Sequence, residues 1–171
     1  MKSSIAQETP LLLGDGRGVQ MVPMRWWHIE EVAVWEQQMF PGSAWTPAQF
    51  WAELAAEGRW VQVALDDAGA VCGYVDVAVA GHDADLMTIA VIPPWQGHGL
   101  GGALMRAALA AATAGGAWQM FLEVRDDNPA RAMYEHYGFQ MLQRRRGYYA
   151  DGADALVMRL RLPITDGGSR L

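Results

Sequence analysis

Cysteine is nearly absent from this 171-residue sequence, and Cys72 alone cannot form a disulfide within the chain. A lone cysteine is typical of a reducing compartment, where its simplest role is that of a small core side chain. Long apolar runs are absent too, since none approaches the ~20 residues that span a bilayer. Residues 1–20 lack the apolar centre of a secretion signal. We therefore expect a cytoplasmic protein without a membrane partner.

Positive charge is also scarce, because 13 Lys and Arg residues face 19 Asp and Glu residues and give a formal net charge of −6. The field of an acidic protein disfavours non-specific binding of nucleic acid and attracts cationic chains. A hydrophobic content of 51% indicates a globular chain long enough to bury a full core. We expect one domain over residues 21–163, with flexible extensions at 1–20 and 164–171, and no nucleic-acid partner.

Two helices are predicted near the start of the domain. Apolar residues at helical spacing predict the first helix over about residues 26–39. Thr46 as N-cap, Pro47 at the first helical position and Gln49 three residues after the cap predict the start of the second helix. The two helices therefore lie close together in the chain.

Strands follow these helices. Residues 60–65 and 70–79 have the apolar or alternating pattern of strands, and the turn at 66–69 joins them as a hairpin. Strand, helix, strand, helix, strand and strand follow in that order. This order indicates an α/β sheet with helices on both faces.

A glycine-rich turn at residues 96–101 lies between an apolar strand at 86–92 and a helix that includes residues 103–109. Backbone N–H groups at such a helix start converge on an anion, so the segment predicts a bound phosphate. No Gly-Lys-Ser/Thr ends the turn, and its glycines do not match the dinucleotide fingerprint. A tight connection without a ligand is the simpler alternative.

A second strand-to-helix unit follows. Residues 121–124 read as a strand, and Pro129 fits the first turn of a helix, where a missing N–H costs nothing. Gly138 fits the left-handed residue just after the helix end, and Phe139 begins the next strand.

These segments resemble the GCN5-related N-acetyltransferases (GNAT), whose turn Gln/Arg-x-x-Gly-x-Gly/Ala is similar to residues 96–101. More narrowly, Leu122 to Arg125 and Met133 to Phe139 are similar to motifs of the RimI-type ribosomal-protein alanine N-acetyltransferases, as are residues 144–149 and 154–158. The resemblance covers about residues 22–162. It implies the GNAT fold, which has a mixed, mostly antiparallel central sheet with a splayed strand pair and helices on both faces.

The resemblance also implies roles for individual residues, with acetyl-CoA as co-substrate and no metal. Glu123 would be the general base, unless it only pairs with Arg125 or a neighbouring basic side chain. Tyr134 would donate a proton to the coenzyme sulfur, unless it only packs in the core. The coenzyme would contact Ile89, Ala90, Val91, Gln96, Gly97, His98, Gly99, Leu100, Gly101, Gly102 and Asn128. The substrate would contact Phe40 and Trp45 and, across the cleft, Tyr148 and Tyr149.

The expected reaction is acetylation of a protein N-terminus, and the resemblance points to the N-terminal Ala of a small ribosomal-subunit protein. At pH 7 an α-amino group costs ~1 kcal/mol to deprotonate, against ~4.6 kcal/mol for a Lys side chain. The alternatives are acetylation of a Lys or a small-molecule amine, and a non-catalytic acyl-CoA-binding module. We expect a monomer or a weak homodimer.

Overall fold

The computed structural model describes residues 9–163, which fall into two compact units. Unit 1 takes the described residues up to Val77 together with Thr88–Ala108, and unit 2 takes Ala78–Met87 together with the described residues from Leu109 onward. No helix in this described range is long and apolar enough to cross a membrane.

The elements of unit 1 are mostly consecutive in the chain. They are β1 (Thr9–Leu12), β2 (Gly18–Pro23), the short 3-10 helix η1 (Trp26–His28), α1 (Ile29–Met39), α2 (Pro47–Ala55), β3 (Arg59–Leu65) and the 3-10 helix η2 (Pro93–Trp95). Three elements contribute residues to both units, namely β4 (Val71–Ala80), β5 (Asp83–Val91) and α3 (Leu100–Ala114). Unit 2 adds β6 (Gln119–Arg125), α4 (Ala130–His136), β7 (Gln140–Arg145) and β8 (Ala155–Arg161).

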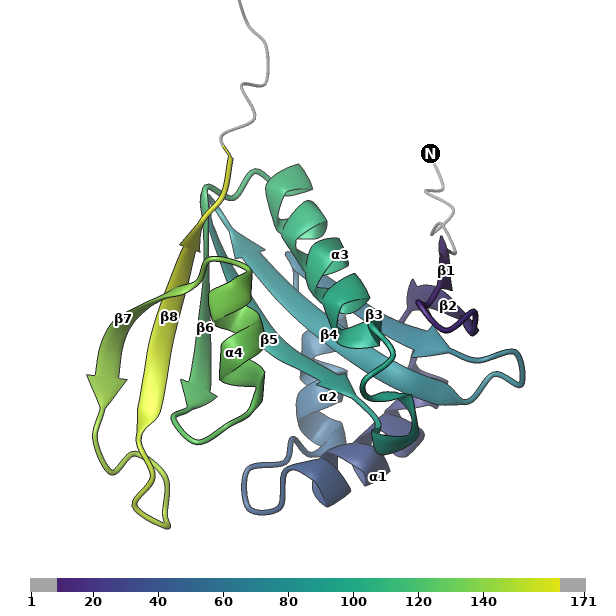
Figure 1. Ribbon diagram of the computed structural model, residues 1–171, viewed down its shortest axis with the longest axis horizontal. Coiled ribbons are helices and arrows are strands. Elements are labelled where there is room, and N and C mark those ends of the chain that lie inside the picture. The colour runs from purple at the N-terminus through teal and green to yellow at the C-terminus, as the bar shows by residue number, and fades with distance from the viewer. Residues whose placement is uncertain (1–8, 164–171) are drawn as a thin grey trace, which may run out of the picture. The chain divides into compact units, whose positions relative to one another are not determined.

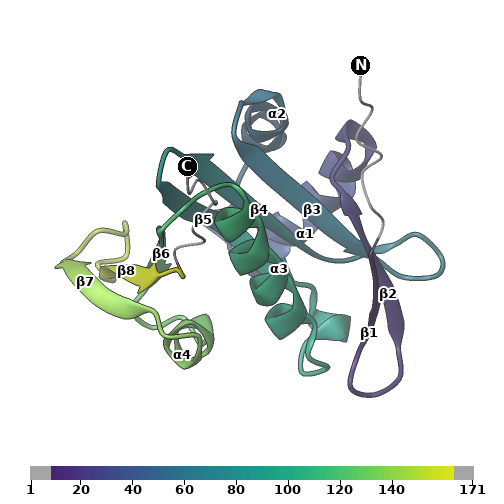
Figure 2. The ribbon, with the colours of Figure 1, turned by 90° about the horizontal axis from the view of Figure 1, so that it is seen from above.

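Helices cover both faces of the sheet in unit 1, as predicted. Successive side chains of a strand point to opposite faces. On β4, Tyr74 lies against Phe50 of α2, with ring centroids 6.0 Å apart. Its neighbour Gly73 faces α3, where an added Cβ would lie 3.1 Å from a methyl group of Leu104. The views in Figures 1 and 2 agree, with α1 and α2 on one side of β3 and β4 and the first turns of α3 on the other.

Unit 2 contains the mixed part of the sheet. β5 pairs in parallel with β6 from Asp83↔Gln119 to Asp85↔Phe121, whereas β8 pairs antiparallel with both β6 and β7. The parallel register ends at Asp85 and Phe121, although β6 continues to Arg125. α4 lies on one side of β6, β8 and β7 (Figures 1 and 2). The predicted mixed, mostly antiparallel sheet is therefore confirmed.

The local predictions of helix ends are also confirmed. The Thr46 hydroxyl accepts a hydrogen bond from the Gln49 backbone N–H at 3.3 Å, and the Gln49 side chain accepts one from the Thr46 N–H at 2.8 Å. Gly138 has φ +92°, a left-handed conformation that favours glycine. The Phe139 N–H donates to the Tyr134 carbonyl at 3.0 Å, which closes the end of α4.

The structure differs from our expectation over residues 1–20, where we predicted a flexible extension. Residues 9–12 and 18–23 form the β1–β2 hairpin, and β2 continues the pairing to β3 through Met21↔Ala64. Val19 and Met21 alternate with exposed residues and are buried, so this short strand has its own apolar face. Residues 1–8 and the predicted tail at 164–171 lie outside the described residues.

Candidate active site

The glycine-rich turn precedes α3 in unit 1. Gly97 has φ +77° and Gly99 has φ +89°, so both positions favour glycine. A Cβ added at either position would meet no atom within 4 Å, which leaves open space beside the backbone. α3 begins at Leu100, and the first N–H groups of a helix have no partner within the helix. The turn is therefore shaped to receive an anion such as a pyrophosphate.

Side chains around the turn hold it in place. Gln96 donates from its side-chain amide to the Val91 carbonyl at 2.9 Å, and His98 Nδ1 lies 2.8 Å from the Asp15 carboxylate. The Arg17 guanidinium lies over the Trp95 ring at 4.9 Å. The β1–β2 hairpin thus braces the turn, and Gln96 and His98 have structural partners in addition to the coenzyme contacts predicted for them.

The other predicted coenzyme residues lie in β5 and before α4. Ala90 is buried in the unit 1 core, whereas Ile89 and Val91 are half-buried. Asn128, in unit 2, accepts a hydrogen bond from the Ala130 N–H through its side-chain oxygen at 2.8 Å. This bond caps the start of α4. The coenzyme contacts of these residues remain predictions.

Glu123 on β6 lies in a cluster of charged and aromatic side chains in unit 2. Its carboxylate is 3.0 Å from the guanidinium of Arg145 on β7, and its side chain is 33% exposed. The Arg145 guanidinium lies over the Tyr148 ring at 5.5 Å, and the Tyr148 and Tyr149 rings are 5.3 Å apart. Burial, and next the negative charge of Glu123, raise the pKa of Tyr149. The structure thus brings the predicted base together with two predicted substrate contacts.

The partner of Glu123 is Arg145, whereas Arg125 is paired elsewhere. The Arg125 guanidinium donates to Asp127 at 3.1 Å and to Asp151 at 2.9 Å, and it lies over the Tyr149 ring at 4.7 Å. Arg145 was one of the neighbouring basic side chains left open by the sequence. Its pairing does not exclude a catalytic role, because the carboxylate remains partly exposed.

Tyr134 lies on α4 in the same unit. It is 7% exposed, and its ring centroid is 6.1 Å from that of Phe139. Burial raises the pKa of Tyr134 to about 12, so its hydroxyl stays protonated at neutral pH. This geometry is compatible with a hydrogen-bond donor and with core packing.

The predicted substrate residues Phe40 and Trp45 lie in the loop between α1 and α2, in unit 1. Trp45 packs on Phe50 with ring centroids 5.3 Å apart, and its backbone N–H donates to Glu36 at 3.2 Å. Tyr74 also donates its hydroxyl proton to Glu36, which is 3% exposed. Burial raises the pKa of Glu36, and these two hydrogen bonds oppose that shift.

Sequence reasoning missed Glu36 as the anchor of this loop. The signal was present, because Ile29, Val32 and Glu36 lie at the spacing of one helix face. A carboxylate on an apolar face needs donors, and Tyr74 and the Trp45 N–H supply them. Phe40 and Trp45 belong to unit 1 while Tyr148 and Tyr149 belong to unit 2, so their facing one another remains a prediction.

Cys72 is fully buried, and burial raises the pKa of its thiol to about 12. A thiol of this kind is not a nucleophile at neutral pH. No other cysteine exists in the sequence. A covalent intermediate on cysteine is therefore not supported.

Comparison with known proteins gives consistent results. Residues 23–139 match the family model for the acetyltransferase (GNAT) family. The N-alpha-acetyltransferase RimI of Mycobacterium tuberculosis is 39% identical over 131 residues, which cover 72% of this chain and 80% of that protein. The ribosomal protein bS18-alanine N-acetyltransferase of Escherichia coli is 35% identical over 138 residues, which cover 78% and 87%. A crystal structure of the ribosomal-protein-S18-alanine N-acetyltransferase from Escherichia coli matches with a TM-score of 0.76 and 29% identity, covering 90% of this chain and 98% of that one.

Proposed function

The chain belongs to the acetyltransferase (GNAT) family, and on that basis we propose that it is an acetyl-CoA-dependent N-alpha-acetyltransferase of protein N-termini. The relatives that support this activity match over more than two thirds of the chain. The name of the Escherichia coli relative supports the N-terminal Ala of a small-subunit ribosomal protein as the substrate. The net charge of −6 suits a cationic partner of that kind, and the single cysteine suits the cytoplasm.

The side chains around Glu123 favour a protein N-terminus over a small polycation as the substrate. A polyamine or an aminoglycoside bears several positive charges, which several carboxylates would match. The partners of Glu123 are instead Arg145 and, beyond it, Tyr148 and Tyr149. A guanidinium beside the base repels a polycation, whereas an α-amine brings only one charge.

Acetyl-CoA, when bound, supplies the thioester whose acetyl group is transferred. Glu123 accepts a proton from the substrate α-ammonium, directly or through one water, which frees the nitrogen lone pair for attack. The nitrogen–carbon bond forms as the carbon–sulfur bond breaks, and the second proton that the nitrogen loses neutralises the departing thiolate, so that free thiol is released. Tyr134 donates a hydrogen bond to the departing sulfur, and its raised pKa makes stabilisation of the thiolate its main contribution. The inert Cys72 supports direct transfer in a ternary complex.

The glycine turn provides the coenzyme site in this proposal. The backbone N–H groups of residues 97–102 would hold the pyrophosphate, because Gly97 and Gly99 have no side chain to block close approach and the start of α3 adds partial positive charge. The backbone of residues 89–91 in β5 would hold the pantetheine arm, and a backbone N–H there would polarise the thioester carbonyl.

A matched pair of peptides tests the proposal. Both begin with Ala and carry a Lys within the next few residues, and one has its α-nitrogen blocked. We expect mass spectrometry to find acetylation at the first nitrogen of the free peptide and almost none on the blocked one, because the α-amine is ~3.5 kcal/mol easier to deprotonate than Lys. Efficient transfer to Lys of the blocked peptide, or to a polyamine in preference to either peptide, contradicts it. Absence of any turnover favours a non-catalytic acyl-CoA-binding module.

A further inference from the structure

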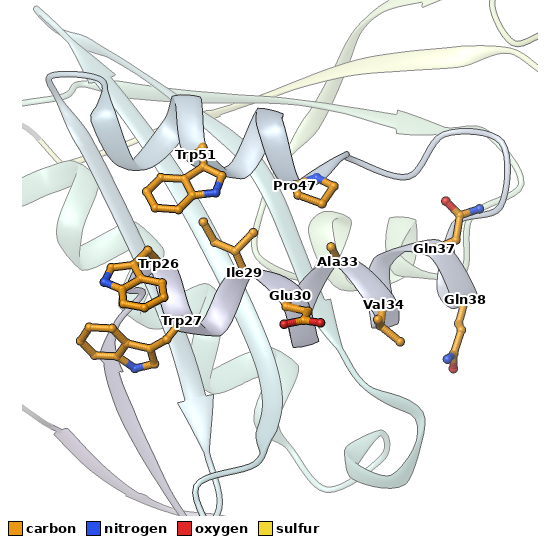
Figure 3. A pocket seen from close by; sticks show the side chains of 10 residues that line it. All are labelled: Trp26, Trp27, Ile29, Glu30, Ala33, Val34, Gln37, Gln38, Pro47 and Trp51. Carbon is orange, nitrogen blue, oxygen red and sulfur yellow. The ribbon is translucent and has the colours of Figure 1, made fainter.

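A groove of about 810 Å³ lies between the η1–α1 segment and α2, entirely within unit 1. Figure 3 shows the indoles of Trp26, Trp27 and Trp51 gathered at one end of it, Glu30 near its middle, and Gln37 and Gln38 at the other end. None of these residues belongs to the site described above.

The indoles of the groove are unusually exposed. The exposed fractions are 61% for Trp26, 59% for Trp27 and 52% for Trp51. Together they present on the order of 400 Å² of aromatic surface, since a Trp side chain offers up to ~250 Å². A protein–protein interface buries ~800 Å² on each side, so the indoles alone supply about half of that area. The largest apolar patch of a typical monomer measures ~300–600 Å² and is often functional, so the indoles make this groove a candidate docking surface.

The chemistry of the groove selects the partner. Its lining combines indole faces with one carboxylate, Glu30, and the amides of Gln37 and Gln38, and it includes no Lys or Arg. Arg25 precedes Trp26 in the chain but does not line the groove. Indole faces attract cations, and a guanidinium can stack on a ring and also pair with a carboxylate. A segment that carries Arg or Lys therefore fits best.

Two other occupants fit less well. A second copy of this chain also has a net charge of −6, and its groove has no Lys or Arg that could pair with Glu30. A partner helix with a purely apolar face would bury the Glu30 carboxylate without a counter-charge, which is costly. A cationic side chain, by contrast, would supply the counter-charge to Glu30.

The position of the groove indicates where on a substrate that cation would lie. The loop that joins α1 to α2 carries Phe40 and Trp45, and Gln37 and Gln38 lie at the loop end of the groove (Figure 3). α1 has 11 residues and spans about 16 Å at 1.5 Å per residue. An extended peptide covers that length in about five residues. A chain with its N-terminus at the loop could place side chains some five to ten residues downstream against the indoles.

We propose that this tryptophan groove is a second docking site for the protein substrate, binding an Arg- or Lys-bearing segment downstream of the acetylated N-terminus. The inference rests on the proposed function, because it assumes that the α1–α2 loop receives the substrate N-terminus. It goes further in assigning a recognition element outside the residues that contact the first positions of the substrate.

Kinetics with two peptides test the proposal. The short peptide has about four residues and begins with Ala, and the long one continues to about 20 residues with several Arg at positions about six to fifteen. We expect Trp26→Ala with Trp51→Ala to raise the KM of the long peptide about tenfold, without changing kcat, the KM of acetyl-CoA or the short-peptide rate. Glu30→Gln should also weaken the long-peptide advantage and its salt dependence. Trp118→Ala is the matched control, because Trp118 is 47% exposed but stacks on His82 in unit 2.

Direct binding separates this proposal from the proposed function. The Arg-bearing segment alone, without the N-terminal residues, should bind the native protein in a calorimetric titration and bind the double variant about tenfold more weakly. That result supports the groove even if no peptide is acetylated. Equal binding to both proteins, or an equal loss of rate with short and long peptides, overturns it. So does sedimentation showing that the native protein is a dimer and the double variant a monomer.

Discussion

Replacing Tyr134 with Phe removes one hydroxyl from α4 and leaves the buried ring in place. Burial raises the pKa of Tyr134 to about 12, while a thiol has a pKa near 8.5. Outright transfer of the proton to the departing thiolate is therefore uphill by about 5 kcal/mol, at ~1.4 kcal/mol per pKa unit. A hydrogen bond to a charged acceptor contributes only ~1.5–3 kcal/mol. We expect Tyr134→Phe to lower kcat by roughly 10–150-fold, which corresponds to that hydrogen bond.

The assay follows the release of free coenzyme thiol at saturating peptide between pH 6.5 and 9. Because the phenol stays protonated throughout this range, the loss should be the same at every pH. A thioester with a more acidic leaving thiol should shrink the loss, since its thiolate needs less stabilisation. Tyr137→Phe, at the end of the same helix, serves as the control and should keep the native rate.

Two results would refute this reasoning. A loss below about threefold, far under the worth of a charge-assisted hydrogen bond, would reduce Tyr134 to a packing residue. A loss that changes steeply between pH 7 and 9 would mean that the phenol titrates there, against the effect of its burial. The circular-dichroism melt of the variant shows whether either result reflects a damaged fold.

Three further predictions concern the base, the glycine turn and a buried carboxyl. Glu123→Gln should lower kcat by about 10²–10⁴-fold at pH 6.5, and kcat should recover partly as the pH passes the pKa of the α-amine. A loss under about threefold at pH 7 would mean that Glu123 is not the general base. Gly101→Val should weaken acetyl-CoA binding at least about tenfold in calorimetric titration, because the added side chain would occupy the proposed pyrophosphate site. The variant should still fold, since Gly101 lies in α3 without a left-handed φ. Unchanged affinity in the folded variant contradicts the proposal that this turn binds the pyrophosphate. Asp76 is 1% exposed, its carboxyl oxygens have no hydrogen-bond partner among the described residues, and burial and then the charge of Glu53 raise its pKa. Because the folded-state pKa is raised, the native protein is most stable below about pH 4, where Asp76 is neutral, and loses stability as the pH rises toward neutrality. Asp76→Asn should therefore raise the free energy of unfolding by more than about 1 kcal/mol in chemical denaturation at pH 7.5 and change it very little at pH 4. Equal effects at both pH values contradict this account.

The parts of the fold that sequence predicted well depend on residues close together in the chain. The capping box of Thr46 and Gln49 and the left-handed Gly138 each involve only a few neighbouring positions. The β1–β2 hairpin was harder, although the alternation of Val19 and Met21 was visible. The strand that β2 pairs with outside the hairpin is β3, which lies far along the chain, so the local sequence pattern does not reveal this pairing.

The surroundings of the candidate base depend on strand register, which is why they could not be read from sequence. Glu123 pairs with Val157 of β8, and β8 pairs with β7, so Arg145 reaches Glu123 across an intervening strand. A register shift near Met141 changes which side chains share a face. The sequence therefore predicted a basic partner without deciding which one. Gln96 was predicted from the sequence as a coenzyme contact, and the structure shows that its side chain also donates a hydrogen bond to the last residue of β5, Val91.

Glu36 gives the α1–α2 loop a fixed frame that protein engineering could use. The Trp45 N–H donates to Glu36 near the end of the loop, and a hydrogen bond from the Ser43 N–H to the Phe40 carbonyl closes a turn at its start. Pro41, Gly42 and Ser43 are exposed, whereas Ala44 is half-buried. A library could vary the exposed positions 41 and 43 and keep Gly42, whose φ of +87° favours glycine. Selection from such a library should yield variants with altered N-terminal preference whose stability stays native, since none of the exchanged side chains holds the frame.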